Sequence, residues 1–235
     1  MRTAAGAPAR PTVEQGAPHR LVPYRHVLHQ HRAALRTALV LVGVAAASAA
    51  GSLLWSAPGR ADRGWGFAFA EAVRLALPLL GGALVAGPMV ADELASGTYK
   101  TAWTQSVTPA RWLLAKTAVA AGVLLALLVP LSVLLWRVRV AGAGADEPVV
   151  AVSSLAHALF TVASGALAGL LVRRAVPAMG LTLVVAVCAL LGGGVWPSST
   201  WHDQLYRTLF LLAGAAVAAG VAFLLLRRVP QGVGS

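Results

Sequence analysis

The sequence predicts an all-α integral membrane protein: six transmembrane helices, preceded by an interfacial amphipathic helix, with both termini in the cytoplasm. Two bulk properties and one pattern predict this fold class. Hydrophobic residues make up 58% and charged residues 11% of the 235 residues, and the mean hydropathy is +0.74, which is too apolar for an ordinary soluble domain. The apolar residues also gather in six runs, each reaching or exceeding the roughly 20 residues that cross a bilayer.

The N-terminal 36 residues divide into two parts. Residues 1–20 are rich in Ala, Pro and Gly, so we expect a disordered cytoplasmic tail. Residues 21–36 predict an interfacial helix, because basic side chains recur there at helical spacing, within about 60° of one another. These side chains are Arg25, His29, Arg32 and Arg36.

The predicted membrane domain covers residues 37–228, and a cytoplasmic tail follows at 229–235. Its spans are predicted at 37–55, 68–91, 110–136, 149–172, 175–195 and 208–226. Thr108 is expected to cap the third helix, with Pro109 in its first helical position. Five spans would follow if the fifth run, which contains Pro177 and ends at Gly192–Gly194, were re-entrant.

The basic residues set the orientation of these helices. The net charge is +11, but the lysines and arginines lie between apolar runs rather than on one soluble face, so nucleic-acid binding is not predicted. Most of them fall on the side that holds both termini, which the positive-inside rule places in the cytoplasm. Tryptophans mark the membrane interfaces: Trp55, Trp65, Trp136, Trp196 and Trp201 outside, Trp103 and Trp112 inside.

Few residues suggest chemistry in this chain. Lys100 and Lys116 are its only lysines and neither follows a phosphate-binding glycine loop, so no ATP site is expected. Three intramembrane polar residues are candidates for function: Glu71 and Arg74, expected to pair at the outer interface, and His157, expected to bond a neighbouring helix.

Other patterns favour structural interpretations. No catalytic set lies in the spans, which argues against an intramembrane enzyme. The histidines at 19, 26, 29 and 31 lack nearby carboxylates or cysteines, so no metal site is predicted. The Gly165–Gly169 spacing favours packing within the chain over a dimer face. Cys188 has no partner for a disulfide and is expected to face lipid or to pack.

The segment 92–116 is unlike a passive connection. Gly97 suits the left-handed end of the second helix, and Thr98 can cap a short helix reaching about residue 105. That helix would lie across the cytoplasmic face and display polar and aromatic groups to a docking partner. The residues that we expect to meet this partner are Asp92, Glu93, Gly97, Thr98, Tyr99, Trp103, Gln105, Ser106, Arg111 and Lys116.

This segment resembles the permease subunits of type-2 ATP-binding-cassette (ABC) exporters, in which an acidic residue followed by Gly-Thr ends the second helix. The corresponding residues are Glu93, Gly97 and Thr98, and the resemblance continues through 104–107, Arg111-Trp112 and Lys116, as in permeases of high-GC bacteria. It implies a coupling helix that docks on a separate ATPase carrying the ATP and Mg²⁺, and a second permease chain, identical or different. It also implies a bacterial cell membrane location.

We hypothesise physical roles for individual residues of this segment. Glu93 would accept hydrogen bonds from the short helix or from an ATPase arginine, and Gly97 would permit the turn. Trp103 and Trp112 would lie at the headgroup level, and Arg111 and Lys116 would meet anionic lipid or ATPase carboxylates. An alternative function from another class is a non-transporting membrane anchor that docks a cytoplasmic partner.

Overall fold

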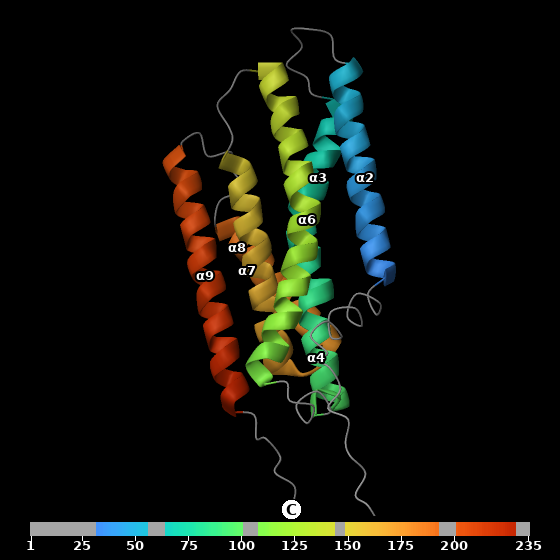
Figure 1. The fold of residues 1–235 in the computed structure, drawn as a ribbon. Coiled ribbons are helices and arrows are strands. Elements are labelled where there is room, and N and C mark those ends of the chain that lie inside the picture. The colour runs from blue at the N-terminus through green and yellow to red at the C-terminus, as the bar shows by residue number, and fades with distance from the viewer. Residues whose placement is uncertain (1–31, 56–63, 101–107, 144–148, 193–200, 229–235) are drawn as a thin grey trace, which may run out of the picture.

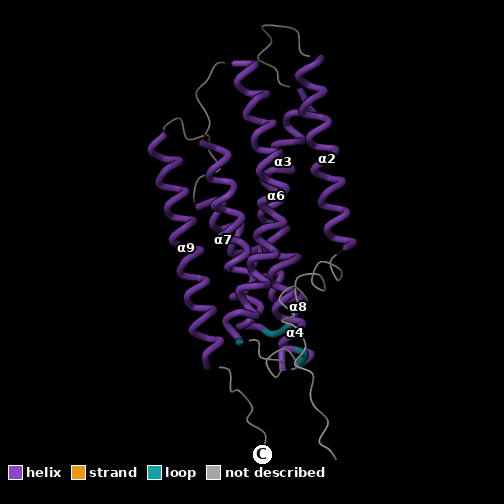
Figure 2. Tube along the Cα trace, viewed as in Figure 1, coloured by secondary structure: helices purple, strands orange, loops and turns teal. Residues whose placement is uncertain are grey.

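The computed structural model describes residues 32–55, 64–100, 108–143, 149–192 and 201–228, and all of its regular elements are helical. They are α2 (Arg32–Trp55), α3 (Gly64–Gly81), the π-helical segment η1 (Gly82–Ala86), α4 (Gly87–Ser96), α6 (Pro109–Ala143), α7 (Val149–Val172), α8 (Ala175–Gly192) and α9 (Trp201–Arg228). The all-α prediction is therefore confirmed for this part of the chain (Figure 2). Both predicted tails, and residues 21–31 of the predicted interfacial helix, lie outside the described residues.

Five helical stretches in the described ranges are long and apolar enough to cross a membrane. They are Trp65–Ser96, Pro109–Val138, Val152–Val172, Ala175–Gly192 and His202–Arg228. These stretches correspond to the second to sixth predicted spans, which confirms a multi-pass membrane protein. Helix α2 has 24 residues, of which the fully described Val42–Gly51 form an apolar stretch, and the first of the six spans stays a prediction.

The helices lie side by side along one long axis, with α2 and α9 on opposite sides of the bundle (Figure 1). Helix α7 is the central element, since it packs against α3, η1, α4, α6, α8 and α9. Its observed bounds equal the predicted bounds of the fourth span. Helix α8 is continuous from Ala175 to Gly192, so the fifth run has no re-entrant turn in that range.

The second span is one long helix interrupted by a π-helical turn. The Gly87 N–H donates to the carbonyl of Gly82, five residues earlier, which widens the turn. Pro88 follows directly and has no N–H to continue the regular bonding pattern. The span consequently runs from Trp65 to Ser96 and is longer than the predicted 68–91.

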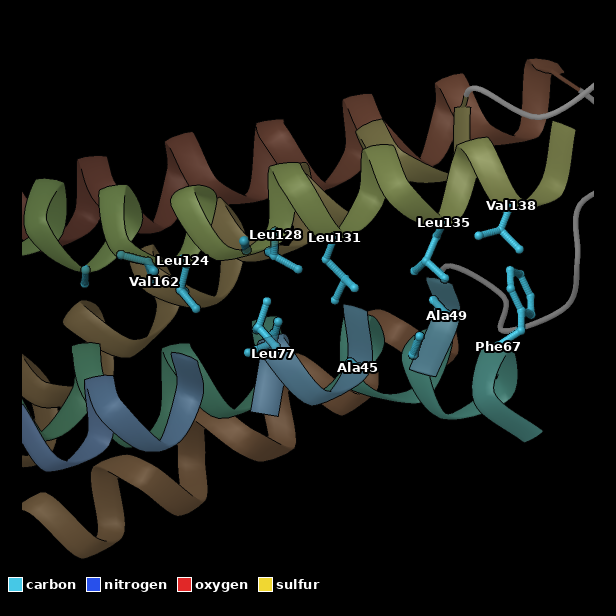
Figure 3. Close-up of a cluster of buried hydrophobic side chains, with 14 of the residues drawn as sticks. Ala45, Ala49, Phe67, Leu77, Leu124, Leu128, Leu131, Leu135, Val138 and Val162 are labelled. Carbon is cyan, nitrogen blue, oxygen red and sulfur yellow. The ribbon is translucent and has the colours of Figure 1, made fainter. Parts of the chain in front are cut away.

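A large apolar cluster joins α2, α3, α6 and α7 (Figure 3). Leu124, Leu128, Leu131 and Leu135 recur at alternate steps of four and three along α6 and are buried, so they form one helix face. That face packs against small residues of α2, Ala45 and Ala49, and against Leu77 of α3. Small side chains in α2 allow the two helices to approach closely.

One end of the bundle, which we call the basic end, holds the end of α4, the start of α6, the α7–α8 connection and the end of α9 (Figure 1). Its exposed basic residues are Lys100, Arg111, Arg173, Arg174, Arg227 and Arg228. A second apolar cluster, the basic-end cluster, lies just inside it and consists of Val90, Trp112, Leu113, Ala166, Leu170, Ala222 and Leu226.

Candidate functional site

The two helices that flank residues 97–108 begin and end as the sequence predicts. Gly97 follows the last residue of α4 in the left-handed conformation, with φ 73° and ψ 3°, where glycine avoids the steric cost that other residues carry. Its carbonyl accepts a hydrogen bond from the Lys100 N–H at 3.0 Å. At the start of α6, the Thr108 hydroxyl oxygen accepts one from the Arg111 N–H at 3.4 Å, which confirms Thr108 as the cap.

Glu93 connects these two helices. One carboxylate oxygen, Oε1, lies 2.5 Å from the ammonium nitrogen of Lys116, and the other, Oε2, accepts a hydrogen bond from Trp112 Nε1–H at 2.9 Å. The Lys116 ammonium also lies 5.4 Å from the centre of the Trp112 ring, within the range of a cation–π interaction. We call Glu93, Trp112 and Lys116 the Glu93 cluster.

The Glu93 cluster is largely withdrawn from solvent. The Lys116 side chain is 5% exposed and that of Glu93 28%, and Trp112 is buried in the basic-end cluster. A buried ammonium needs a charged partner, because removing it from water costs several kcal/mol. We expected Lys116 to meet anionic lipid or ATPase carboxylates, whereas the structure pairs it with Glu93 within the chain.

The other residues expected at the docking face divide into three groups. Tyr99 packs against the basic-end cluster. Asp92, Thr98 and Arg111 are exposed, and the Thr98 hydroxyl lies 3.0 Å from that of Ser96. Trp103, Gln105 and Ser106 lie outside the described residues, and of the predicted short helix the structure describes Tyr99 and Lys100, which are helical.

A second polar group lies near the opposite end of the bundle, where Glu71 and Arg74 form the expected ion pair. The guanidinium NH2 of Arg74 is 2.6 Å from Glu71 Oε2, and its Nε–H donates to the same oxygen at 2.7 Å. Arg74 also donates to the hydroxyl of Ser154 in α7. The sequence did not indicate Ser154, and Arg74 is 4% exposed, so this pair joins α3 to α7 inside the bundle.

His157 is buried one turn further along α7. Its ring lies edge-on to Phe160, with centroids 6.4 Å apart, and it interacts with the backbone of Ala186 in α8. Its Nε2 is buried without a hydrogen-bond partner in the described part of the chain. No group of three or more histidines, cysteines or acidic residues suited to a metal occurs in the described part of the chain.

A family model for ABC-2 membrane transporter-related proteins matches residues 55–196, more than half of the chain. The chain belongs to this ABC-2-related family. The match runs from the end of α2 through α8 and so includes the Glu93 cluster, the Glu71–Arg74 pair and the connection between them. No curated protein and no solved structure matches the chain.

Membership of the ABC-2-related family indicates a membrane permease component of an ABC transporter, and such components work with an ATPase partner in general. The sequence indicated the three residues of the Glu93 cluster one by one, but not that they contact one another. The signal of the cluster was an acid at the end of one apolar run and a lysine at the start of the next, at similar depth.

Proposed function

We propose that this chain is the permease subunit of an ABC exporter, without an ATP site of its own, and that a separate ATPase moves it through the 97–108 connection. ATP and Mg²⁺ would then bind to that ATPase. A second permease chain, identical or different, would complete the translocation path. The cargo class that suits a path of Ala, Leu, Val and Gly is a small amphiphile, a drug or a lipid-like molecule.

The observation that carries this proposal is the Glu93 cluster. Its hydrogen bond and ion pair tie the last turn of α4 to the first two turns of α6, the two helices joined by the proposed coupling segment. A displacement of that segment would therefore move both helices together instead of being absorbed by a flexible connection. A passive loop does not require a buried ion pair at its base.

The proposed topology places the basic end in the cytoplasm of a bacterial cell. Its exposed lysine and arginines support this orientation through the positive-inside rule. In the same scheme the part of α2 from residue 37 onward is the first of six spans, residues 21–36 lie on the membrane surface and both termini are cytoplasmic. Accessibility of single cysteines placed at Lys100 and at Arg137, at opposite ends of the bundle, tests the orientation directly.

The function is tested by co-expressing the full chain with candidate P-loop ATPases from the same genome. We expect a stable complex whose ATP hydrolysis falls when Gly97→Pro is introduced, because proline fixes φ near −65° and the observed φ is 73°. Gly122→Ala is the matched control, since Gly122 lies within α6 with no atom within 4 Å of an added Cβ.

The outcomes of this experiment separate the exporter from its alternative. A complex that forms but hydrolyses ATP at the same rate with Gly97→Pro would contradict coupling through this connection. Stable capture of the ATPase without cargo movement in proteoliposomes would favour the membrane-anchor function instead.

A further inference from the structure

We propose that the arginines at the ends of α7 and α9 form a binding site for the phosphate headgroup of an anionic phospholipid. The site comprises Arg173, Arg174, Arg227 and Arg228, which we call the arginine group. This inference goes beyond the proposed function and does not depend on it, because it concerns lipid binding by the permease chain alone.

Helix packing brings the arginine group together. Helices α7 and α9 contact each other, and Leu170 and Leu226 near their ends belong to the same buried cluster. Arg173 and Arg174 come within about one turn of Leu170, and Arg227 directly follows Leu226. Four positive charges from two helices therefore lie at one level of the basic end.

The chain itself does not neutralise these charges in the part that the structure describes. All four arginines are exposed, and none of them forms an ion pair with another described residue, whereas Glu71 pairs with Arg74 and Glu93 with Lys116. The carboxylate of Glu93, which lies at the same end, is occupied by Lys116 and Trp112. An external anion is thus the natural partner of the arginine group, and guanidinium groups bind phosphate through paired hydrogen bonds.

The neighbouring side chains indicate an amphiphilic anion. Leu171 and Val176, beside Arg173 and Arg174, are 57% and 76% exposed. Leu224, one turn before Arg227, is 60% exposed. Apolar surface directly inside a row of guanidinium groups matches a phospholipid, with acyl chains on the leucines and valine and the phosphate on the arginines.

The backbone at Arg173 supports a role for its side chain. Arg173 has φ 53° and is the non-glycine residue with positive φ in the described ranges. Glycine usually holds this position after a helix, and a larger residue there is strained. Favourable charge at the ends of helices α7 and α9 explains basic residues in general, but it does not explain an arginine where glycine fits better.

The experiment uses the full chain in phosphatidylcholine bilayers with a trace of spin-labelled phosphatidylglycerol or spin-labelled phosphatidylcholine. Electron paramagnetic resonance measures the fraction of labelled lipid that the protein immobilises. We expect about a fivefold preference for phosphatidylglycerol, reduced to near unity by the combined Arg173→Gln, Arg174→Gln, Arg227→Gln and Arg228→Gln variant. Arg137→Gln, an exposed arginine at the other end, should keep the wild-type preference.

A second variant separates binding from structure. Arg173→Gly relieves the left-handed strain, so its unfolding midpoint should not fall, while the preference should drop about twofold. An unchanged preference in Arg173→Gly or in the combined variant overturns the proposal. The proposal is also overturned if inorganic phosphate abolishes the lipid preference, because that result indicates a site for free anions. It is overturned as well if the combined variant keeps its lipid preference and loses only its capture of the ATPase, because that result indicates a protein-docking surface.

Discussion

Replacing Glu93 by glutamine tests whether the Glu93 cluster holds α4 and α6 together. Glutamine keeps an oxygen that can accept from Trp112 Nε1–H, now at 2.9 Å, but it removes the charge that faces Lys116. The Lys116 side chain is 5% exposed, so its ammonium would be left without compensation in an apolar environment. This substitution therefore isolates the ion pair from the hydrogen bond.

The expected loss follows from the burial of the two partners. Removing one member of a buried ion pair costs about 3–5 kcal/mol, and the 28% exposure of the Glu93 side chain places this pair near the lower figure. A loss of about 3 kcal/mol lowers the unfolding midpoint by about 6–12 °C for a chain of this size. Adding Lys116→Met removes the uncompensated charge at similar volume and should restore all but about 1 kcal/mol.

The assay is thermal unfolding of the purified chain in one detergent, followed by tryptophan fluorescence. Asp92→Asn is the matched control, because Asp92 is the adjacent acid on α4 and is exposed. Its free energy of unfolding should change by less than about 0.5 kcal/mol. The reasoning is refuted if Glu93→Gln behaves like Asp92→Asn, or if the double variant is no more stable than Glu93→Gln alone.

Three further predictions concern the helices inside the membrane. Gly165→Ala should cost about 2 kcal/mol or more in unfolding free energy, because its Cβ would lie 2.5 Å from the Gly82 carbonyl oxygen. The control is Gly180→Ala, which should not destabilise the protein because no atom lies within 4 Å of its added Cβ. Equal unfolding midpoints for the two variants would contradict the close packing. In the same assay, Arg74→Met should lower the unfolding free energy by about 3 kcal/mol and Ser154→Ala by about 1 kcal/mol. A wild-type unfolding midpoint for Arg74→Met would contradict the structural role of the Glu71–Arg74 pair. Cys188 is exposed on α8, so a nitroxide attached there should be relaxed more by oxygen than by a water-soluble nickel chelate; the reverse order would show that it faces water.

Sequence patterns predicted the parts of this fold that depend on local chemistry. The bounds of α7 follow from an apolar run between Pro148 and the Arg173–Arg174 pair. The left-handed Gly97 and the Thr108 cap follow from residue types with strong backbone or hydrogen-bonding preferences. The Gly165–Gly169 spacing also predicted packing within the chain, and both glycines contact the η1–α4 backbone.

The parts that escaped prediction depend on which helix faces meet. Lys116 was expected to face lipid or an ATPase, because its pairing with Glu93 requires knowing that α4 and α6 turn these residues toward each other. Ser154 is 80 positions from Arg74 in the chain, so no local pattern connects them. The π-helical turn had a signal in Gly81, Gly82 and Pro88, but glycine and proline in a span are too common to specify one.

The helix that contains Glu93 has different mechanical properties along its length. Near the basic end, α4 is tied to α6 through the Glu93 cluster. In its middle, Gly82 and Gly87 meet α7 at backbone distance through Gly165 and Gly169, and this region coincides with the π-helical turn. Toward the other end, Arg74 is bonded to Ser154 of α7. The π turn and Pro88 interrupt the regular hydrogen bonding at this contact with α7, and Pro78 interrupts it again between this contact and Arg74. Under the proposed coupling, a force applied at the 97–108 connection would therefore bend this helix near residues 78–88 more easily than it would shift the Arg74 contact.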